Sequence, residues 1–296
     1  MQLEFRELLP RDAKWAAPLM MASGRMGCEF SYTTAYMWSQ YYDVRLARVG
    51  EGLILCSNAG VVPSFLVPVG IPLEDGIELL KQHAQEHGIP LKLHGIDEQV
   101  KERLQSHYPH AVFTPHEEDF DYIYSTEILA ELPGNTYHSK RNHIAAFSRK
   151  YEWAFEPITE ANHEEVVELA REWCLEKGGC QDSGLSSEQC AIRRLLRYRE
   201  ELSVRGGLIR VDGKAVAFTL GSPINDSVFD VHVEKALSAY AGAYAVINRE
   251  FARTLREFPY LNRENDLGIP GLRRAKESYH PAILLKKYTC ELLCDG

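Results

Sequence analysis

The stretch that decides the fold, residues 206–223, reads GGLIRVDGKAVAFTLGSP. Two apolar, β-rich runs flank Asp212-Gly213, and Asp-Gly between such runs is a strong signal for a tight β-hairpin. Residues 51–70 read EGLILCSNAGVVPSFLVPVG and follow the same plan: Gly-Leu-Ile, an apolar run, a turn with Asn-Ala-Gly, and a second run that ends on glycine. We therefore expect two antiparallel hairpins of similar design.

The segments upstream of the two hairpins also resemble each other. LEFRELLPRDAKWAAPLM, from residue 3, and WAFEPITEANHEEVVELA, from residue 153, each pass from a short strand through Asp or Asn into a helix-like pattern. Both similarities are offset by about 150 residues, as in a chain that repeats one α/β unit. We expect an N-terminal domain over residues 1–132, a basic connecting helix over 133–153 and a C-terminal domain over 154–296.

The second half has a recognisable order of elements. Two helices precede the hairpin, and a strand over SVFDVHVEK, a helix over AYAVINREFARTLREF and a closing strand over AILLKKYTCELL follow it. This mixture predicts an α+β fold with a mixed sheet. It is also the order of a GNAT-like acyltransferase half, in which the strand before the long helix splays from its neighbour and the helix N-terminus faces the gap. We expect two tandem GNAT-like domains.

Coenzyme A users of the GNAT-like fold carry Arg or Gln and small glycines at the turn before that helix, in the spacing R-x-x-G-x-G/A. The turn here reads EKALSAYAGAYAVINREF, with Gly242 but with neither Arg nor Gln at the expected place. Gly242 is therefore the candidate for binding an acyl-coenzyme A cofactor. The damaged signature weakens that donor without removing it.

Glu234 lies at the end of the strand SVFDVHVEK, where alternation puts Asp230, His232 and Glu234 on one side. A strand-end acid that faces a cleft can orient or deprotonate an amine, which makes Glu234 a candidate catalytic group. A polar edge that faces the surface explains the same pattern equally well.

Charge and hydropathy exclude several classes of protein. The formal net charge of −9 argues against a protein that coats DNA or RNA, although a local basic site within an acidic body is compatible with it. The seven cysteines are scattered, and we expect free thiols and no metal site. We find no apolar run of about 18 residues and no secretion-signal pattern at the N-terminus. We expect a cytoplasmic protein with no integral membrane segment.

Residues 262–279, NRENDLGIPGLRRAKESY, are unusually dense in mixed charge. Two glycines flank a proline, and no period of 2 or 3.6 residues sorts the apolar side chains onto one face. The acids and bases can satisfy one another as an internal salt-bridge network. Alternatively, they can bind a ligand, which would explain why such a network exists away from water.

That segment and its continuation, YLNRENDLGIPGLRRAKESYHPAILLKKY, together with YHSKRNHIAAF and CEFSYTTAYMW, resemble the phosphatidylglycerol lysyltransferase C-terminal domain family. The resemblance covers nearly the whole chain and implies two GNAT-like halves. It also implies acyl transfer, because the membrane-bound members of the family move an aminoacyl group from aminoacyl-tRNA to the glycerol hydroxyl of a lipid. Fem-type peptidoglycan bridge ligases are relatives in architecture and donor.

An aminoacyl ester needs positioning, a base for the attacking group and a cation for the oxyanion. On this resemblance, we expect Asp266 to act beside Glu234 in catalysis. We expect the substrate to be bound by the charged segment and by the K-R-N motif, namely by Asn262, Arg263, Glu264, Arg273, Lys276, Tyr279, Lys140, Arg141 and Asn142.

The acceptor need not be a lipid, because the sequence shows no transmembrane flippase segment. A small molecule or a peptide with an amine or hydroxyl group is as plausible. Three function hypotheses stay open: an aminoacyl-tRNA-dependent transferase, an acyl-coenzyme A-dependent N-acetyltransferase, and a non-catalytic ligand-binding relative of the same fold.

Overall fold

The structure is a computed structural model that describes residues 2–179 and 183–292. The chain forms two compact units. The first contains the residues up to Tyr122, the segment Glu264–Ala275 and the residues from Ile283 on; the second contains Ile123–Arg263 and Lys276–Ala282. This division differs from the expected boundaries at residues 132 and 154, since two C-terminal segments return to the first unit.

A seven-stranded mixed sheet is the centre of the first unit, with the strand order β1-β2-β3-β4-β5-β14-β6. Strand β4 runs parallel to β5, and all other neighbouring strands of this sheet pair antiparallel. The strands are β1 (Arg6–Glu7), β2 (Val44–Val49), β3 (Gly52–Ser57), β4 (Ser64–Leu66), β5 (Leu91–Ile96), β6 (Val112–Pro115) and β14 (Tyr288–Leu292).

The helices of the first unit end where the sequence supplies caps. Helix α3 buries Ile77, Leu80 and Ala84 on one face and ends at Gly88, whose φ of +63° is the left-handed conformation of a helix C-cap. The side chain of Asp97 caps α4 by accepting a bond from the Val100 amide. The helices are η1 (Pro10–Asp12), α1 (Ala13–Ala22), η2 (Cys28–Phe30), α2 (Tyr32–Trp38), α3 (Leu73–His87), α4 (Glu98–His107) and η3 (Glu117–Asp119).

Most strands of a second seven-stranded sheet, with the strand order β13-β7-β12-β11-β10-β9-β8, lie in the second unit; β13 and the first two residues of β7 are assigned to the first. Strand β11 runs parallel to β12, and β10 pairs antiparallel with both β11 and β9. The strands are β7 (Asp121–Ser125), β8 (Trp153–Pro157), β9 (Arg205–Val211), β10 (Lys214–Pro223), β11 (Val228–Ala236), β12 (Tyr260–Asn262) and β13 (Ile283–Leu285).

The predicted hairpin at Asp212-Gly213 is confirmed, because both residues adopt positive φ, of 48° and 83°, between β9 and β10. Phe218 and Phe229 are fully buried in the core that this sheet forms with its helices. The helices are α5 (Thr126–Glu131), α6 (His138–Lys150), α7 (His163–Glu176), α8 (Ser183–Arg197), α9 (Ala243–Arg253) and α10 (Pro270–Glu277), the last of which crosses from the first unit into the second.

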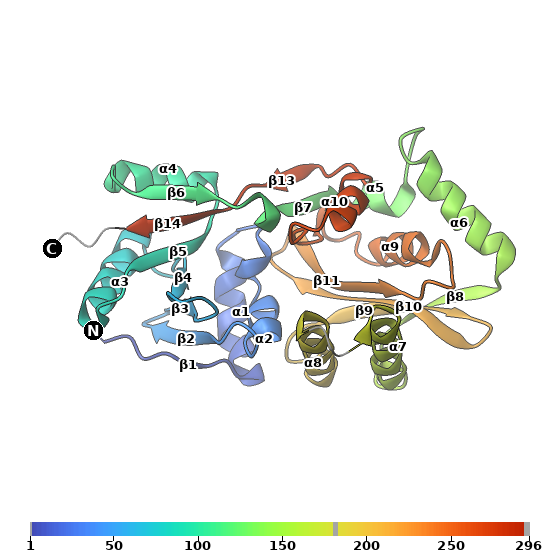
Figure 1. Ribbon diagram of the computed structural model, residues 1–296, viewed down its shortest axis with the longest axis horizontal. Coiled ribbons are helices and arrows are strands. Elements are labelled where there is room, and N and C mark those ends of the chain that lie inside the picture. The colour runs from blue at the N-terminus through green and yellow to red at the C-terminus, as the bar shows by residue number, and fades with distance from the viewer. Residues whose placement is uncertain (1, 180–182, 293–296) are drawn as a thin grey trace. The chain divides into compact units, whose positions relative to one another are not determined.

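The two sheets repeat one topology, as the sequence predicts. Read from its other edge, the second order is β8-β9-β10-β11-β12-β7-β13, which matches the first strand for strand. In each repeat α-helices lie between the first two strands, and one helix, α3 or α9, precedes the strand that closes the parallel pair. The sixth strand is distant in the chain: β14, red in Figure 1, lies between β5 and β6 of the first sheet. The last segment, expected as one strand of the second half, is therefore split between β13 and β14.

Within residues 2–179 and 183–292, each helix is either too short or too polar to cross a bilayer.

Candidate functional site

Strands β11 and β12 separate where the candidate site lies. Their parallel pairing ends, among the described residues, at Asp230 and Asn262. Strand β11 continues beyond this point and carries Glu234, while Arg263 is the first residue after β12. The splayed strands that the GNAT-like order predicts thus present an acid and a base where they part.

Glu234 and Arg263 form an ion pair, with Nη2 of Arg263 2.8 Å from Oε1 of Glu234. The other carboxylate oxygen accepts a hydrogen bond of 3.1 Å from Nδ2 of Asn248, on helix α9. The side chains of Arg263 and Glu234 are 13% and 11% exposed, so the pair is neither sealed nor on an open surface. Burial by itself lowers the pKa of Arg263, but the charge of Glu234, the neighbouring Tyr124 and Tyr279 and the hydrogen bond to Glu234 together outweigh burial and raise this pKa above its usual value.

Aromatic rings and a second cation surround this pair. The guanidinium of Arg263 lies 5.6 Å from the ring centroid of Tyr124 and 5.1 Å from that of Tyr279. Nζ of Lys140 lies 3.9 Å from the centroid of Tyr279 and donates to Oγ of Ser278 at 2.6 Å. Burial and the neighbouring charge of Arg263 lower the pKa of Lys140. Burial is the main reason why the pKa of Tyr279 rises to about 12.

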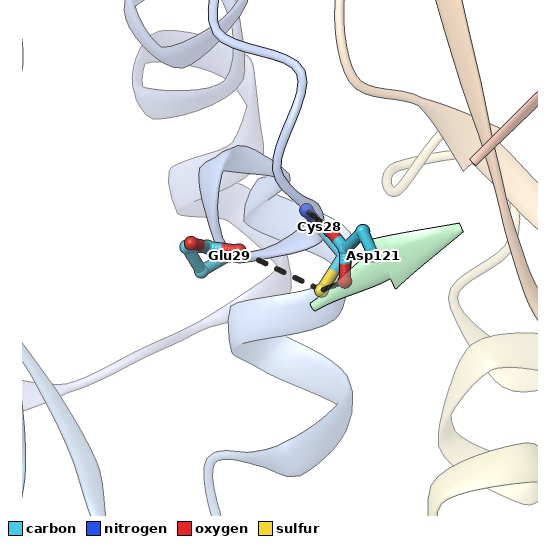
Figure 2. Close-up of side chains that lie close together, drawn as sticks. All are labelled: Cys28, Glu29 and Asp121. Atoms are coloured by element: carbon cyan, nitrogen blue, oxygen red, sulfur yellow. Dashed lines mark hydrogen bonds between the residues drawn. The ribbon is translucent and has the colours of Figure 1, made fainter. Parts of the chain in front are cut away.

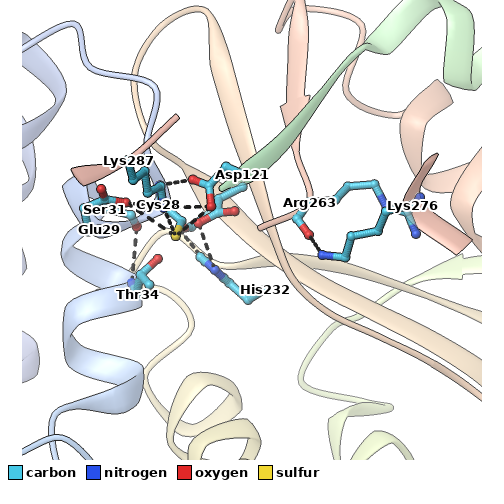
Figure 3. Close-up of polar contacts among 11 residues, drawn as sticks. Cys28, Glu29, Ser31, Thr34, Asp121, His232, Arg263, Lys276 and Lys287 are labelled. Carbon is cyan, nitrogen blue, oxygen red and sulfur yellow. Dashed lines mark hydrogen bonds and ion pairs between the residues drawn. The ribbon is translucent and has the colours of Figure 1, made fainter. Parts of the chain in front are cut away.

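Lys276 and Asn262 hold the backbone beside the pair. The Lys276 ammonium donates to the main-chain oxygen of Arg263 (Figure 3), and the main-chain oxygen of Lys276 accepts a 2.8 Å bond from the Tyr124 hydroxyl. Asn262 is the buried last residue of β12. The contacts of Lys276 hold the main chain at Arg263 in place. Lys276 and Asn262 therefore both lie at the site, where Lys276 bonds to the protein itself.

The charged segment divides between the units. Asn262, Arg263, Lys276 and Tyr279 belong to the second unit, whereas Glu264–Ala275 belongs to the first. The structure therefore brings together Lys140, Glu234, Arg263, Lys276 and Tyr279 of the predicted residues. Asp266 and Arg273 form a separate group within the first unit, and Glu264 is assigned to the same unit.

Asp266 is the centre of that separate group. Its carboxylate accepts bonds from Nε of Arg273 at 2.7 Å, from the Tyr122 hydroxyl at 2.7 Å and from the Gly268 amide at 2.8 Å. The carboxylate is fully buried. Burial raises its pKa, but these three donors outweigh burial and hold the pKa below its usual value. Asp266 and Arg273 thus form an internal salt bridge, the first of the two alternatives for the charged segment. The main-chain oxygen of Glu264 accepts a hydrogen bond from the Tyr122 amide.

The three residues of the K-R-N motif, on helix α6, lie in three different environments. Lys140 faces Tyr279, as described. Arg141 donates to the main-chain oxygens of Leu132 and, at 2.7 Å, of Gly134, and so closes the turn that precedes α6. Asn142 is exposed on α6. Of the three, Lys140 alone contacts the residues around Glu234 in the described part of the chain.

Gly242, the candidate cofactor-binding residue, is packed against helix α6. Its φ is +96°, and a Cβ at this position would lie 2.8 Å from the main-chain oxygen of His143 and 3.2 Å from Cβ of Phe147. Close approach of two backbones therefore explains a glycine here without a bound ligand.

A cluster in the first unit combines Cys28, Glu29 and Asp121 (Figure 2), a set of side chains that can bind a metal ion. Nζ of Lys287 lies 2.7 Å from both carboxylates and 3.4 Å from the Cys28 sulfur. Burial raises the pKa of the Cys28 thiol well above its usual value, so the thiol keeps its proton. The lysine ammonium is the cation of this cluster, and a metal ion would have to displace it.

The sequence from residue 21 to residue 291 matches the family model described as "Phosphatidylglycerol lysyltransferase, C-terminal". The chain belongs to this family. The resemblance read from the charged segment is thereby confirmed.

A crystal structure of a conserved protein of unknown function from Bacteroides thetaiotaomicron is 35% identical, with a TM-score of 0.94 over 99% of this chain and 100% of that one. The C-terminal domain of a putative lysylphosphatidylglycerol synthetase from Agrobacterium fabrum is 14% identical, with a TM-score of 0.70 over 95% and 91%. An uncharacterised protein of Mycoplasmoides gallisepticum is 22% identical over 182 residues, and the match spans 58% of its length.

The fold is shared more widely than the family. FemX is 9% identical to this chain, with a TM-score of 0.59 over 97% of it, and a tandem GNAT protein from the clavulanic acid biosynthesis pathway is 11% identical, with a TM-score of 0.50. The predicted α+β fold of two tandem GNAT-like halves is confirmed.

Two residues of the site in this family member escaped the sequence reading. Asn248 shares a face of helix α9 with Ala245 and Ala252, which are buried and apolar. A lone polar residue on an apolar helix face was the available signal, since buried amides need partners. Tyr124 alternates with Tyr122 along β7, but alternation alone does not say which ring meets an arginine.

Proposed function

We propose that this chain is an acyltransferase that moves an activated aminoacyl group, supplied by aminoacyl-tRNA, to the amine or hydroxyl of a small-molecule or peptide acceptor. The ion pair of Glu234 and Arg263 at the splay of a GNAT-like sheet carries the proposal. Membership of the phosphatidylglycerol lysyltransferase C-terminal family supports the choice of donor, because the membrane-bound members use aminoacyl-tRNA.

Arg263 is suited to bind the oxyanion of acyl transfer. An attack on the aminoacyl ester turns the carbonyl oxygen into an oxyanion, and a fixed N–H donor in a partly buried site stabilises that charge. The carboxylate of Glu234 holds Nη2, and the rings of Tyr124 and Tyr279 lie near the guanidinium, so Nη1 stays available and oriented. Glu234 then acts by positioning Arg263, because a carboxylate paired with an arginine is a weak base.

Lys140 is the proton acceptor that we assign to the attacking group. Its lowered pKa increases the neutral fraction near neutral pH. Lys140 and Arg263 both contact the ring of Tyr279, which places Lys140 near the ion pair. In the transfer, the acceptor gives its proton to Lys140 while its N or O bonds to the carbonyl carbon. The ester C–O bond then breaks, and the released ribose oxygen takes the proton from Lys140, which returns the lysine to its neutral form.

Helix α6 offers the donor a local basic surface on an acidic chain. It carries Lys140, Arg141, Arg149 and Lys150 and contains no Asp or Glu. Arg149 and Lys150 are exposed at its C-terminal end. Neutralising a few phosphates needs only such a patch, and binding would depend steeply on salt.

Acyl-coenzyme A is the less favoured donor. In GNAT-like enzymes its pyrophosphate lies at the turn before the helix that corresponds to α9. Here Gly242, at that turn, is packed against the backbone of α6.

The test combines donor binding with transfer. We expect filter binding of aminoacyl-tRNA with a log–log salt slope that Arg149→Ala and Lys150→Ala each reduce by about one. Release of labelled amino acid to a mixture of amines and peptides should fall at least about tenfold in Arg263→Lys, which keeps the charge but loses the fork. Arg171→Ala, an exposed arginine of α7, is the matched control. A salt slope near zero and no release above the uncatalysed rate would refute the proposal.

A further inference from the structure

Two buried polar atoms at the site have no hydrogen-bond partner among the described residues. They are Nη1 of Arg263, which is a donor, and Oδ1 of Asn248, which is an acceptor. Asn248 is 5% exposed. Buried polar groups are nearly always bonded, so a donor and an acceptor left unbonded on two side chains that share the Glu234 carboxylate call for ligand or water atoms that satisfy them.

The two side chains are held by one carboxylate through their other polar atoms. Glu234 accepts from Nη2 of Arg263 through Oε1 and from Nδ2 of Asn248 through Oε2. The orientation of the Asn248 amide follows from chemistry, because a carboxylate accepts from the NH₂ group and repels the carbonyl oxygen. Glu234 therefore fixes which atoms of its two neighbours remain open, and it places a negative charge beside them.

The open atoms match the two ends of an α-aminoacyl group. We propose that Asn248 is a specificity-determining residue whose Oδ1 accepts a hydrogen bond from the α-ammonium of the transferred group, while Nη1 of Arg263 donates to its carbonyl oxygen. The carboxylate of Glu234 adds attraction for the ammonium. A plain acyl group, such as acetyl or propionyl, satisfies Arg263 and leaves Asn248 unbonded.

This inference rests on the proposed function and names the residue by which the site would recognise the free α-amino group of its donor. A site built to bond a polar group of its substrate discriminates against an analogue that lacks the group, because the buried partner is then left unbonded. Selection by Asn248 requires neither a particular amino-acid side chain nor a particular acceptor.

The experiment uses stable amide analogues of the aminoacyl-tRNA terminus, built on 3′-amino-3′-deoxyadenosine. Alanyl and lysyl derivatives are compared with propionyl and 6-aminohexanoyl derivatives, which lack only the α-amino group. By calorimetric titration of the whole chain, we expect each α-amino analogue to bind at least about tenfold more tightly than its partner. Asn248→Ala should remove this ratio and leave the affinity for the propionyl derivative unchanged. Asn58→Ala, an exposed asparagine of the first unit, is the control and should keep the ratio.

The outcomes separate this inference from the function on which it rests. Equal affinity of the wild-type protein within both pairs would overturn the α-amino selection and leave acyl transfer standing. An unchanged ratio in folded Asn248→Ala would reassign Asn248 to packing. Binding of no analogue would count against both proposals. The wild-type comparison needs no variant, so an Asn248→Ala protein that fails to fold does not remove the test.

Discussion

Oε1 of Glu234 lies 2.8 Å from Nη2 of Arg263, and this contact joins two parallel strands just beyond the point where their pairing ends. Twenty-nine positions separate the two residues in the chain. Since both side chains are mostly buried, each charge depends on the other for its solvation. The pair therefore stabilises the chain where the two strands separate, as well as orienting Arg263.

Glu234→Gln tests that dependence. The substitution keeps the shape of the side chain but leaves the guanidinium of Arg263 without its counter-charge, so we expect a loss of about 3–5 kcal/mol in the free energy of unfolding. Urea denaturation measures it. Glu168→Gln, which breaks an exposed helical pair with Arg171, should leave the urea midpoint unchanged. A similar small effect of both substitutions would mean that the Glu234 pair is effectively solvated.

Lys140 should be the more reactive of two lysines on one helix. Its pKa is lowered, so its neutral, nucleophilic amine forms at a lower pH than usual. We expect competitive labelling with acetic anhydride near pH 8, followed by peptide mass spectrometry, to modify Lys140 faster than the exposed Lys150. Transfer activity should rise with pH through the lowered pKa and be lost in Lys140→Met. Slower labelling of Lys140 would contradict the assigned role as base.

We expect Asp266 to stabilise the folded chain in a way that depends on pH in the acid range. Its pKa is lower in the folded chain than its ordinary value, so its stabilising effect is present above that ordinary value, near pH 4, and is lost as the pH falls through the folded value. At pH 7, Asp266→Asn should cost roughly 2–3 kcal/mol, because hydrogen bonds to a charged group are lost. Toward pH 2 the difference from wild type should shrink.

Urea midpoints of the Asp266→Asn variant at several pH values give this profile. The exposed Asp75→Asn variant is the control, with no expected change at either pH. A cost of the Asp266 substitution that stays constant from pH 7 to pH 2 would mean that the carboxylate charge contributes nothing there.

The sequence predicts the repeat, both hairpins and the splayed strand with Glu234, because each follows from local patterns such as Asp212-Gly213. It does not predict that β14 joins the first sheet between β5 and β6, since a short apolar strand can pair within either sheet equally well. The charged segment posed the same difficulty. Local sequence could not show that Asp266 pairs with Arg273 seven residues on, whereas neighbouring Arg263 pairs with Glu234 on another strand.

Gly242→Ala separates packing from cofactor binding at the start of α9. The new Cβ would lie 2.8 Å from the main-chain oxygen of His143 at a φ of +96°, so the substitution combines backbone strain with a clash. We expect a loss of more than about 1 kcal/mol in stability and faster amide hydrogen exchange in α6. Gly213→Ala is the matched control, because its φ is +83° and no atom lies within 4 Å of the added Cβ. The excess cost of Gly242→Ala over this control measures the contact with α6.

Titration with acetyl-coenzyme A tests the alternative role of Gly242. If the glycine serves packing, the wild-type chain should show no binding. Binding that Gly242→Ala abolishes would instead return Gly242 to a cofactor site.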